Sequence, residues 1–207
     1  MPKQDVCIVD YGVGNHESVR TALDALGVSY RVSSSPEVIA SAKAYVLPGV
    51  GAFAEAMQNL ESRKLVEPLR REVVERGKPL LGICLGMQVL AEGSTEGGVH
   101  KGLGCIPGHI VRVEERGGFP VPHVGWNEIS MRQKEPLFSL LDEGAHFYFD
   151  HSYHFETAPE YIAATVSYGG DITAAVQHKN IFGVQFHPEK SQNNGLRVLR
   201  AFLNYVG

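Results

Sequence analysis

The alternation of strand-like and helix-like segments in the first half of the chain constrains its fold more than any other feature. Apolar, strand-like runs, each followed by a turn signal, lie at residues 6–9, 28–32, 44–47 and 80–83. Helix-forming stretches separate them at residues 15–27, 35–42 and 52–76, the last interrupted near residues 61–63. Strands that alternate with helices pair in parallel, so the pattern predicts an α/β fold with an open, mostly parallel sheet covered on both faces.

Residues that typically begin or end helices and strands lie at the expected ends of these elements. Asn15 precedes the first helix as an N-cap, and Gly27 follows it as a stop signal. Ser35 and Pro36 form a cap and first-turn pair at the start of the second helix. The third strand is expected to break at Pro48, because proline lacks the backbone N–H that a ladder uses.

The second half of the chain is richer in β-branched and aromatic residues, punctuated by Gly, Asn and Pro. These runs predict strands and hairpins, some of them antiparallel additions to the core, at residues 109–115, 146–155, 161–169, 171–179 and 181–189. The chain closes with an amphipathic helix over residues 192–207. No linker or repeat interrupts the pattern, so we expect one domain over residues 1–207.

Composition and charge exclude several classes of function. The 207 residues carry a formal net charge of −4 with no basic run, which argues against nucleic-acid binding. No apolar run approaches the roughly 18 residues of a membrane helix, so we expect no membrane segment. The three cysteines are odd in number and lack C-x-x-C spacing, which favours a reducing, cytoplasmic setting over a secreted disulfide framework.

A cysteine lies between two glycines, in GICLG, where a strand passes into helix-forming sequence. Gly82 and Gly86 permit a sharp turn and close backbone approach, which would hold the Cys84 side chain above the carboxyl edge of the sheet. A helix N-terminus beside the sulfur favours the thiolate. The backbone N–H of Leu85 follows the nucleophile and is suited to bind an oxyanion. Cys84 is therefore a candidate nucleophile, with a small buried filler as the alternative.

The sequence IFGVQFHPEKS supplies the candidate base. His187 and Glu189 lie two residues apart, so an extended backbone would turn both side chains to one side. Pro188 holds His187 in an extended conformation. An acid behind an imidazole fixes its tautomer, so these residues and Cys84 would form a nucleophile–base–orienter triad. A strand-end histidine beside a solvated glutamate is the alternative.

Other signals are weaker. The GVG sequence at residues 12–14 lacks the third glycine of a dinucleotide-binding motif, because that position is Glu17. His151 and His154 would face opposite ways in a strand, so we predict no metal site, and we expect no cofactor. Trp126 falls in an expected loop, as either a core residue or a half-buried interface residue.

Taken together, GICLGMQ and the downstream FHPE resemble the class I, or triad, glutamine amidotransferases, which hydrolyse glutamine and release ammonia. DYGVGNHESV, LPGVGAF, PHVGWN and HPEKSQNNG extend the resemblance over nearly the whole chain, to the branch that serves histidine biosynthesis. The resemblance implies a flavodoxin-like fold, L-glutamine as substrate and a heterodimer with a (β/α)₈-barrel cyclase subunit. Two alternatives stay open: the glutaminase of pyridoxal phosphate synthase, which also docks on a barrel, and a non-catalytic regulatory subunit.

The resemblance also assigns roles to residues of the site. It makes Cys84 the nucleophile, His187 the base and then the acid, and Glu189 the orienter. The backbone amides that it places in the oxyanion hole are those of Gly49, Val50, Gly51 and Leu85. The residues that it expects to hold glutamine are Gly51, Gln88, Glu96, Ser152 and Tyr153.

The same resemblance predicts a surface for the partner. Its residues are Asn15, His123, Trp126, Asn127, Tyr148 and Lys190. It further implies that the isolated chain is a poor glutaminase, because its oxyanion strand awaits the ligand-bound partner. His16 and His154 depart from the residues usual in the family, which puts only local contacts in question.

Overall fold

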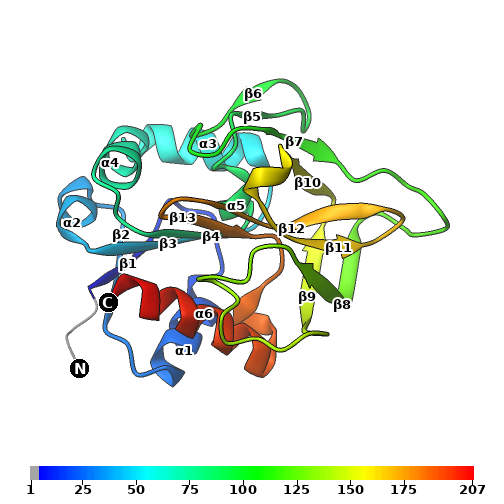
Figure 1. The fold of residues 1–207 in the computed structure, drawn as a ribbon. Coiled ribbons are helices and arrows are strands. Elements are labelled where there is room, and N and C mark those ends of the chain that lie inside the picture. Colours follow the sequence, from blue (N-terminus) through cyan, green and yellow to red (C-terminus); the bar gives the residue numbers. More distant parts are fainter. Residues whose placement is uncertain (1–4) are drawn as a thin grey trace.

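A large sheet runs through the computed structural model, which describes residues 5–207, so the first four residues of the predicted domain lie outside it (Figure 1). Its strands lie in the order β2 (Tyr30–Ser33), β1 (Val6–Val9), β3 (Ala44–Gly49), β4 (Leu80–Cys84), β13 (Ile181–Val184), β12 (Asp171–His178), β11 (Ile162–Ser167), β8 (His123–Met131) and β9 (His146–His151). The strands from β2 to β13 pair in parallel, and the pairs from β13 to β9 are antiparallel. The predicted α/β class, a parallel core with antiparallel additions, is confirmed.

One predicted strand end is wrong. β3 does not break at Pro48 but continues through it to Gly49, and Pro48 pairs with Ile83 of β4. On its other side β3 pairs with β1 only as far as Val46. Because no strand lies beside Pro48 on that side, its missing N–H leaves no ladder bond unmade there.

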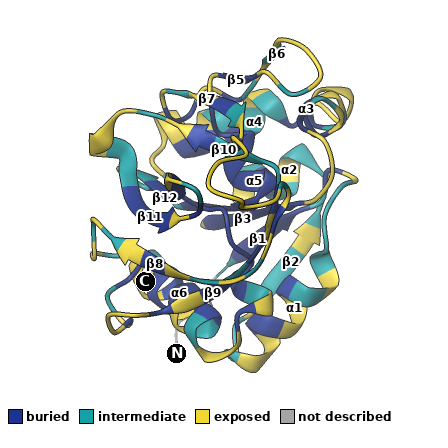
Figure 2. Cartoon of the chain, turned by 90° about the vertical axis from the view of Figure 1, so that its right-hand side faces the viewer, coloured by how far each residue is buried: buried dark blue, intermediate teal, exposed yellow. Residues whose placement is uncertain are grey.

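Helices cover both faces of the parallel part of the sheet. The helices on one face are α1 (His16–Ala25) and α6 (Gln192–Val206), and those on the other are α2 (Pro36–Ser41), α3 (Phe53–Ser62), α4 (Val66–Arg70) and the short α5 (Leu85–Gln88). Side chains of β1 alternate between the two cores: Val6 and Ile8 pack with α1 and α6, whereas Cys7 and Val9 pack with the other set. Figure 2 shows the result, with buried strands inside and exposed outer surfaces on the helices.

The predicted helix caps are confirmed. The Asn15 side chain accepts a hydrogen bond from the backbone N–H of Ser18 over 3.2 Å, and Ser35 accepts one from the N–H of Val38 over 3.3 Å. Gly27 follows α1 with φ +70°, a conformation that favours glycine. These local signals therefore set where α1 and α2 begin and where α1 ends.

The expected loop around Trp126 is instead part of β8, a strand of nine residues. Its side chains alternate in exposure, with His123 and Ile129 buried, and Val124 and Trp126 exposed. The strand was missed because glycine and asparagine have low strand propensity and the sequence here is HVGWN. Residues 123–128 instead form a strand by pairing with β9, and residues 129–131 continue it by pairing with β11.

A second, smaller sheet lies beside the large one (Figure 1). Its order is β10 (Tyr153–Glu156), β7 (His109–Arg112), β5 (Gly93–Ser94) and β6 (His100–Lys101). β10 follows β9 with a single residue, Ser152, between them, so the chain passes from one sheet to the other at that point.

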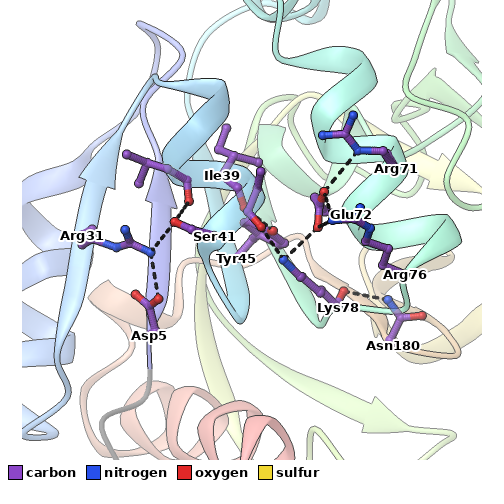
Figure 3. Close-up of polar contacts among 12 residues, drawn as sticks. Asp5, Arg31, Ile39, Ser41, Tyr45, Arg71, Glu72, Arg76, Lys78 and Asn180 are labelled. Atoms are coloured by element: carbon purple, nitrogen blue, oxygen red, sulfur yellow. Dashed lines mark hydrogen bonds and ion pairs between the residues drawn. The ribbon is translucent and has the colours of Figure 1, made fainter.

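A fully buried carboxylate anchors the end of the helical stretch that follows β3. That stretch is interrupted between α3 and α4, as predicted, and α4 then passes into a π-helical turn that carries Glu72. The Glu72 carboxylate contacts Arg76 Nη1 at 2.9 Å, Lys78 Nζ at 2.8 Å and Arg71 Nε at 3.2 Å (Figure 3). Despite its burial, these donors hold the pKa of Glu72 below its ordinary value, so the carboxylate is charged and paired.

Every helix among residues 5–207 is too short or too polar to span a lipid bilayer.

Candidate active site

Cys84 lies at the junction of β4 and α5 in a backbone conformation that side chains rarely adopt, with φ 53° and ψ −111°. The flanking glycines make the turn possible by letting backbones touch. A β-carbon added to Gly82 would lie 2.5 Å from the carbonyl oxygen of Gly86, and one added to Gly86 would lie 1.7 Å from that of Leu47. The predicted sharp turn is therefore present, and it holds the Cys84 side chain at the carboxyl edge of the sheet.

The helix after Cys84 is short. α5 contains four residues, so few aligned peptide dipoles face the sulfur and their combined effect is small. The imidazole of His187 lies on the wall of the same cavity as the Cys84 sulfur, and the interaction between the two contributes to the raised pKa of His187. The positive charge beside the sulfur thus comes from a side chain far away in the sequence rather than from the helix.

The His187 side chain is buried beside Glu189. Its Nδ1 donates to Glu189 Oε1 over 2.7 Å, and the two side chains are only 3% and 2% exposed. Because Nδ1 is engaged, Nε2 is the ring nitrogen left for the sulfur of Cys84. Burial opposes charge on the ring, but the hydrogen bonds to Cys84 and Glu189 outweigh it and raise the pKa of His187 well above its ordinary value. A protonated imidazole beside a cysteine sulfur is the neighbour that favours a thiolate.

A turn, rather than the predicted extended segment, brings Glu189 to His187. His187 itself is extended, with φ −99° and ψ 95°, as the following proline requires. Glu189 then lies in a 3₁₀ turn over Pro188–Lys190, which folds its carboxylate back toward the imidazole. The predicted contact is present, but the alternation of an extended strand does not create it.

A cavity of about 380 Å³ opens beside Cys84 and His187. The predicted site residues on its wall are Val50, Gly51, Cys84, Leu85, Gln88, Glu96, Ser152, Tyr153, His187 and Lys190. These residues come from segments spread over more than half of the chain, which the sheet brings to one edge. The cavity therefore unites the expected nucleophile, base and glutamine-binding residues.

The segment predicted to form the oxyanion hole follows the end of β3. Gly49 pairs with Cys84 across the β3–β4 ladder and is not on the cavity wall, whereas Val50 and Gly51 are. Gly51 has φ +101°, which favours glycine, and the Val50 side chain is 41% exposed. This segment lies directly beside the nucleophile, and that its amides stabilise an oxyanion stays a prediction.

Buried amides form a network behind the sulfur. Gln185, fully buried, donates from Nε2 to Cys84 Sγ over 3.6 Å. Gln88 Nε2 donates to Gln185 Oε1 over 3.1 Å and to the carbonyl oxygen of Tyr153 over 3.0 Å. Both N–H groups of Gln88 are thus occupied within the described part of the chain. The atom of Gln88 that remains to meet a ligand is the acceptor Oε1.

Two buried histidines extend this network to β8. His151 Nδ1 donates to the carbonyl oxygen of Tyr153 over 2.8 Å, so its Nε2 accepts from His123 Nδ1 over 2.9 Å. His123 Nε2 in turn accepts from Asn127 Nδ2 over 2.7 Å. Burial lowers the pKa of His123 to about 4 and that of His151 to about 3, so both rings are neutral. Each ring then has the one donor and one acceptor that this chain of bonds requires.

Three of the six predicted interface residues, Trp126, Tyr148 and Lys190, lie together at one rim of the cavity, and Lys190 is on its wall. Trp126 is 46% exposed, and its ring centroid lies 6.1 Å from that of Tyr148. The Tyr148 ring lies 6.5 Å from that of His187, and Lys190 Nζ lies 5.6 Å from the Tyr148 centroid. Asn15 is instead engaged locally as the cap of α1. A partner protein that docks on this rim would therefore contact residues adjacent to His187, the proposed base.

His123 differs from the other predicted interface residues. Its side chain has no exposed surface and is stacked between Phe149, at 4.6 Å, and Tyr168, at 4.0 Å, between ring centroids. In this arrangement it cannot touch a partner directly. It can support a docking surface only from beneath, through its bond with Asn127.

Several residues of the site carry no sequence signal and were missed. The unpredicted residues on the cavity wall are Arg112, Pro122, Asp150 and His151, and Gln185 lies just behind it. Arg112 is a cation on β7 whose pairing with Tyr153 of β10 brings it to this edge. It also borders a neighbouring cavity of about 390 Å³, which lacks a cysteine on its wall. Arg112 therefore reaches the site through strand pairing and not as part of a local motif.

The other two cysteines are unsuited to be nucleophiles. Cys7 and Cys105 are buried and free, and burial raises the pKa of each thiol to about 11. Neither lines the cavity. Cys84 is therefore the thiol that the site can use.

Known proteins resemble this chain over almost its whole length. The sequence profile of the family described as "Glutamine amidotransferase class-I" matches residues 7–205. The chain is 47% identical over 202 residues to the imidazole glycerol phosphate synthase subunit HisH 2 of Vibrio vulnificus (strain YJ016), covering 97% of this chain and 94% of that protein. It is 45% identical over 203 residues to subunit HisH of the same enzyme from Geobacter sulfurreducens, covering 95% of this chain and 97% of that protein.

Solved structures share the fold at lower sequence identity. A crystal structure titled as a glutamine amidotransferase has a TM-score of 0.76 at 22% identity and covers 97% of this chain and 98% of that chain. The structure of PurLQS from Thermotoga maritima has a TM-score of 0.75 at 20% identity and covers 99% of this chain and 100% of that chain. These likenesses concern the architecture of the sheet and its helices.

Proposed function

The chain belongs to the class-I glutamine amidotransferase family, and from this premise we propose that it is the glutaminase subunit of an imidazole glycerol phosphate synthase. Its substrate would be L-glutamine, which it hydrolyses to glutamate and ammonia. The single observation that carries the proposal is the cavity where Cys84 and His187 meet, with Glu189 bonded behind the imidazole. We further propose that residues 1–207 form one amidotransferase domain and that it works in the cytoplasm, a setting that three free cysteines support.

The proposed reaction begins with an ion pair. The Cys84 thiolate attacks the side-chain carbonyl carbon of glutamine, and the carbonyl oxygen becomes an oxyanion facing the amides of residues 49–51 and Leu85. The His187 imidazolium then gives its Nε2 proton to the leaving ammonia, while Glu189 holds the ring through Nδ1. A γ-glutamyl thioester remains on Cys84. Water, deprotonated by the now neutral His187, hydrolyses it to glutamate and restores the ion pair.

The cavity also offers complementary charges to the amino-acid end of glutamine. Glu96 reaches the wall while its Oε2 accepts a hydrogen bond from the backbone N–H of Phe53 over 2.7 Å. With Gln88 Oε1, it supplies acceptors for the α-ammonium group. Arg112 supplies the cation that an α-carboxylate prefers. The two oppositely charged groups on the α-carbon of glutamine would thus each face a part of the wall with complementary charge or hydrogen-bonding groups.

The relatives are named as subunits, and we propose that this chain likewise acts with a partner subunit. The finer proposal is that the partner is a (β/α)₈-barrel cyclase, in a heterodimer. Ammonia released into water would be protonated and lost as a nucleophile, so it must pass directly to the enzyme that uses it. The cyclase would join it to a phosphoribulosyl-formimino ribotide and yield imidazole glycerol phosphate and aminoimidazole carboxamide ribotide in histidine biosynthesis.

The rim that carries Trp126, Tyr148 and Lys190 is the proposed docking surface. Its residues lie next to His187, and the neighbouring Val124 is 53% exposed. An exposed tryptophan beside an exposed valine is typical of a surface that a partner covers. Docking here would close the cavity on the side where ammonia must leave.

A reconstituted glutaminase assay tests the proposal. The chain is assayed for glutamate release alone, with the cyclase barrel and its nucleotide ligand, and with the barrel of pyridoxal phosphate synthase as a matched control. We expect slow turnover alone and with the control barrel, and strong stimulation by the cyclase barrel. Stimulation by the control barrel instead would favour that alternative. A cyclase complex that works with ammonia but never with glutamine would indicate a non-catalytic subunit.

A further inference from the structure

A buried hydroxyl without a partner lies beneath the segment at residues 49–51. The side chain of Tyr11 is fully buried in the core shared with α3 and α5. Its hydroxyl has no hydrogen-bond partner among residues 5–207. Burial, and to a smaller extent the nearby Cys84, raises the pKa of Tyr11, so the hydroxyl stays protonated. The group is therefore a donor with nothing to donate to, and such a group destabilises a fold.

The hydroxyl lies at a specific place in the site. A β-carbon added to Gly49 would lie 2.2 Å from Tyr11 Oη and 3.0 Å from both the backbone nitrogen of Gly86 and the β-carbon of Leu85. The hydroxyl thus lies against the backbone of Gly49, between the end of β3 and the start of α5. These are the two segments whose amides we propose to bind the oxyanion. Glycine at residue 49 keeps the space between the hydroxyl and the strand open.

Another buried tyrosine on the same side of the sheet shows the ordinary arrangement. Tyr45 has no exposed surface either, but its hydroxyl donates to the carbonyl oxygen of Ile39 over 2.6 Å (Figure 3). The two tyrosines differ in position along the sheet. Tyr45 lies within β3 and bonds to α2, whereas Tyr11 follows β1 and reaches the catalytic edge. The missing bond is thus confined to the tyrosine next to the active site.

The geometry of the peptide unit indicates what the Tyr11 hydroxyl could bond. In a trans peptide the N–H and the C=O point in opposite directions. A rotation that turns the Val50 N–H toward the cavity must turn the carbonyl oxygen of Gly49 away from it, toward the interior. Tyr11 Oη is fully buried and lies against the backbone of Gly49, on the side to which a β-carbon would point. The rotation would thus give the hydroxyl its acceptor and the oxyanion its donor in one movement.

We propose that Tyr11 is a positioning residue whose hydroxyl stabilises the catalytically active arrangement of the 49–51 segment by donating to the carbonyl oxygen of Gly49. The inference rests on the proposed glutaminase function and adds to it a residue that does not touch the substrate. The unpartnered hydroxyl raises the free energy of the arrangement that the structure shows, and the hydrogen bond would lower that of an arrangement in which the Gly49 carbonyl oxygen faces Tyr11. Both effects favour the active arrangement once a partner has docked.

The test compares Tyr11→Phe with Tyr45→Phe, which removes a buried hydroxyl from the same core. Each variant is assembled with the cyclase barrel, and kcat and KM for glutamine are measured beside thermal unfolding of the isolated chain. We expect Tyr11→Phe to lower kcat about tenfold with little change in KM, the loss expected for one hydrogen bond formed only in the active arrangement. Its unfolding temperature should stay the same or rise. Tyr45→Phe should show the reverse, with a lower unfolding temperature and an unchanged kcat.

The opposite outcomes are equally clear. A Tyr11→Phe variant with unchanged kcat would overturn the proposal, because the hydroxyl would then be an orphan without a function. A variant with lower kcat and a matching loss of thermal stability would overturn it too, since the hydroxyl would then be structural. If the wild-type complex releases no glutamate while it still uses ammonia, the proposed function fails instead, and the two failures are distinguished.

Discussion

Adding one methyl group at Gly86 should disable the site through packing alone. A β-carbon at this residue would lie 1.7 Å from the carbonyl oxygen of Leu47 and 2.7 Å from its carbonyl carbon. A carbon–oxygen contact is normally about 3.3 Å or longer, so α5 and β3 must separate by about 1.6 Å. Both of these atoms belong to the backbone of Leu47, inside the sheet, so neither can move away from the added β-carbon. The helix that begins after Cys84 must therefore shift.

The size of the effect follows from that displacement. Overpacking of a core costs about 1–3 kcal/mol, and alanine in place of a helical glycine returns part of this, about 0.5–1 kcal/mol. In a domain of this length the net loss should lower the unfolding temperature by roughly 2–8 °C. A shift of about 1 Å in catalytic groups costs on the order of a hundredfold in rate. Glutaminase activity should consequently fall far more than stability.

The assay for Gly86→Ala combines thermal unfolding with glutamate release by the assembled complex. Gly27→Ala is the matched control, because nothing lies within 4 Å of a β-carbon at Gly27 and its φ of +70° makes the cost conformational. We expect the control to lose stability with its glutaminase activity intact. A Gly86→Ala chain with wild-type stability and wild-type turnover would refute the packing argument and the turn built on it.

Two further predictions concern a buried and an exposed charge. Glu72→Gln should destabilise the fold by about 1–2 kcal/mol near neutral pH, measured by urea unfolding, because it removes the charge that pairs with Lys78, Arg76 and Arg71, whose side chains are 23%, 57% and 49% exposed. Since the folded-state pKa of Glu72 is lowered, this contribution is present above the unfolded pKa and lost as pH falls through the folded one, so the difference from wild type should shrink below about pH 4. A constant difference down to pH 2 would contradict it. Arg112→Ala should raise KM for glutamine about tenfold with a smaller change in kcat, whereas Arg116→Ala, on the neighbouring cavity, should leave KM alone.

Local patterns in the sequence predicted the elements of the fold better than their arrangement. β1 occupies the four residues that its apolar run indicated, and Asn15 and Ser35 cap helices as expected. These features depend on neighbours in sequence, which a pattern can read. The start of β8 was missed because the residues HVGWN form a strand through pairing with β9, about 25 residues further along the chain, rather than through their own strand propensity.

The candidate site shows the same division. The turn at Cys84 and the extended His187 follow from the flanking glycines and proline, which act locally. That the two meet depends on β13 lying next to β4 in the sheet, a pairing of residues about a hundred positions apart. Arg112 enters the site through a similar long-range pairing, and Gln185, directly before FHPE in the sequence, reaches the Cys84 sulfur from the end of β13. The resemblance to a family predicted the role of each residue, whereas the order of the strands determines which residues lie close together.

Covalent trapping of the nucleophile tests the central claim most directly, which is that Cys84 attacks glutamine with the help of His187. The assembled complex is incubated with a glutamine analogue that carries an electrophile in place of the side-chain amide, and the adduct is located by peptide mass spectrometry. We predict an adduct on Cys84 that forms at least about a hundredfold more slowly in His187→Asn, the scale of lost acid–base assistance. An adduct on Cys7 or Cys105 instead, or an unchanged rate in His187→Asn, would contradict the account.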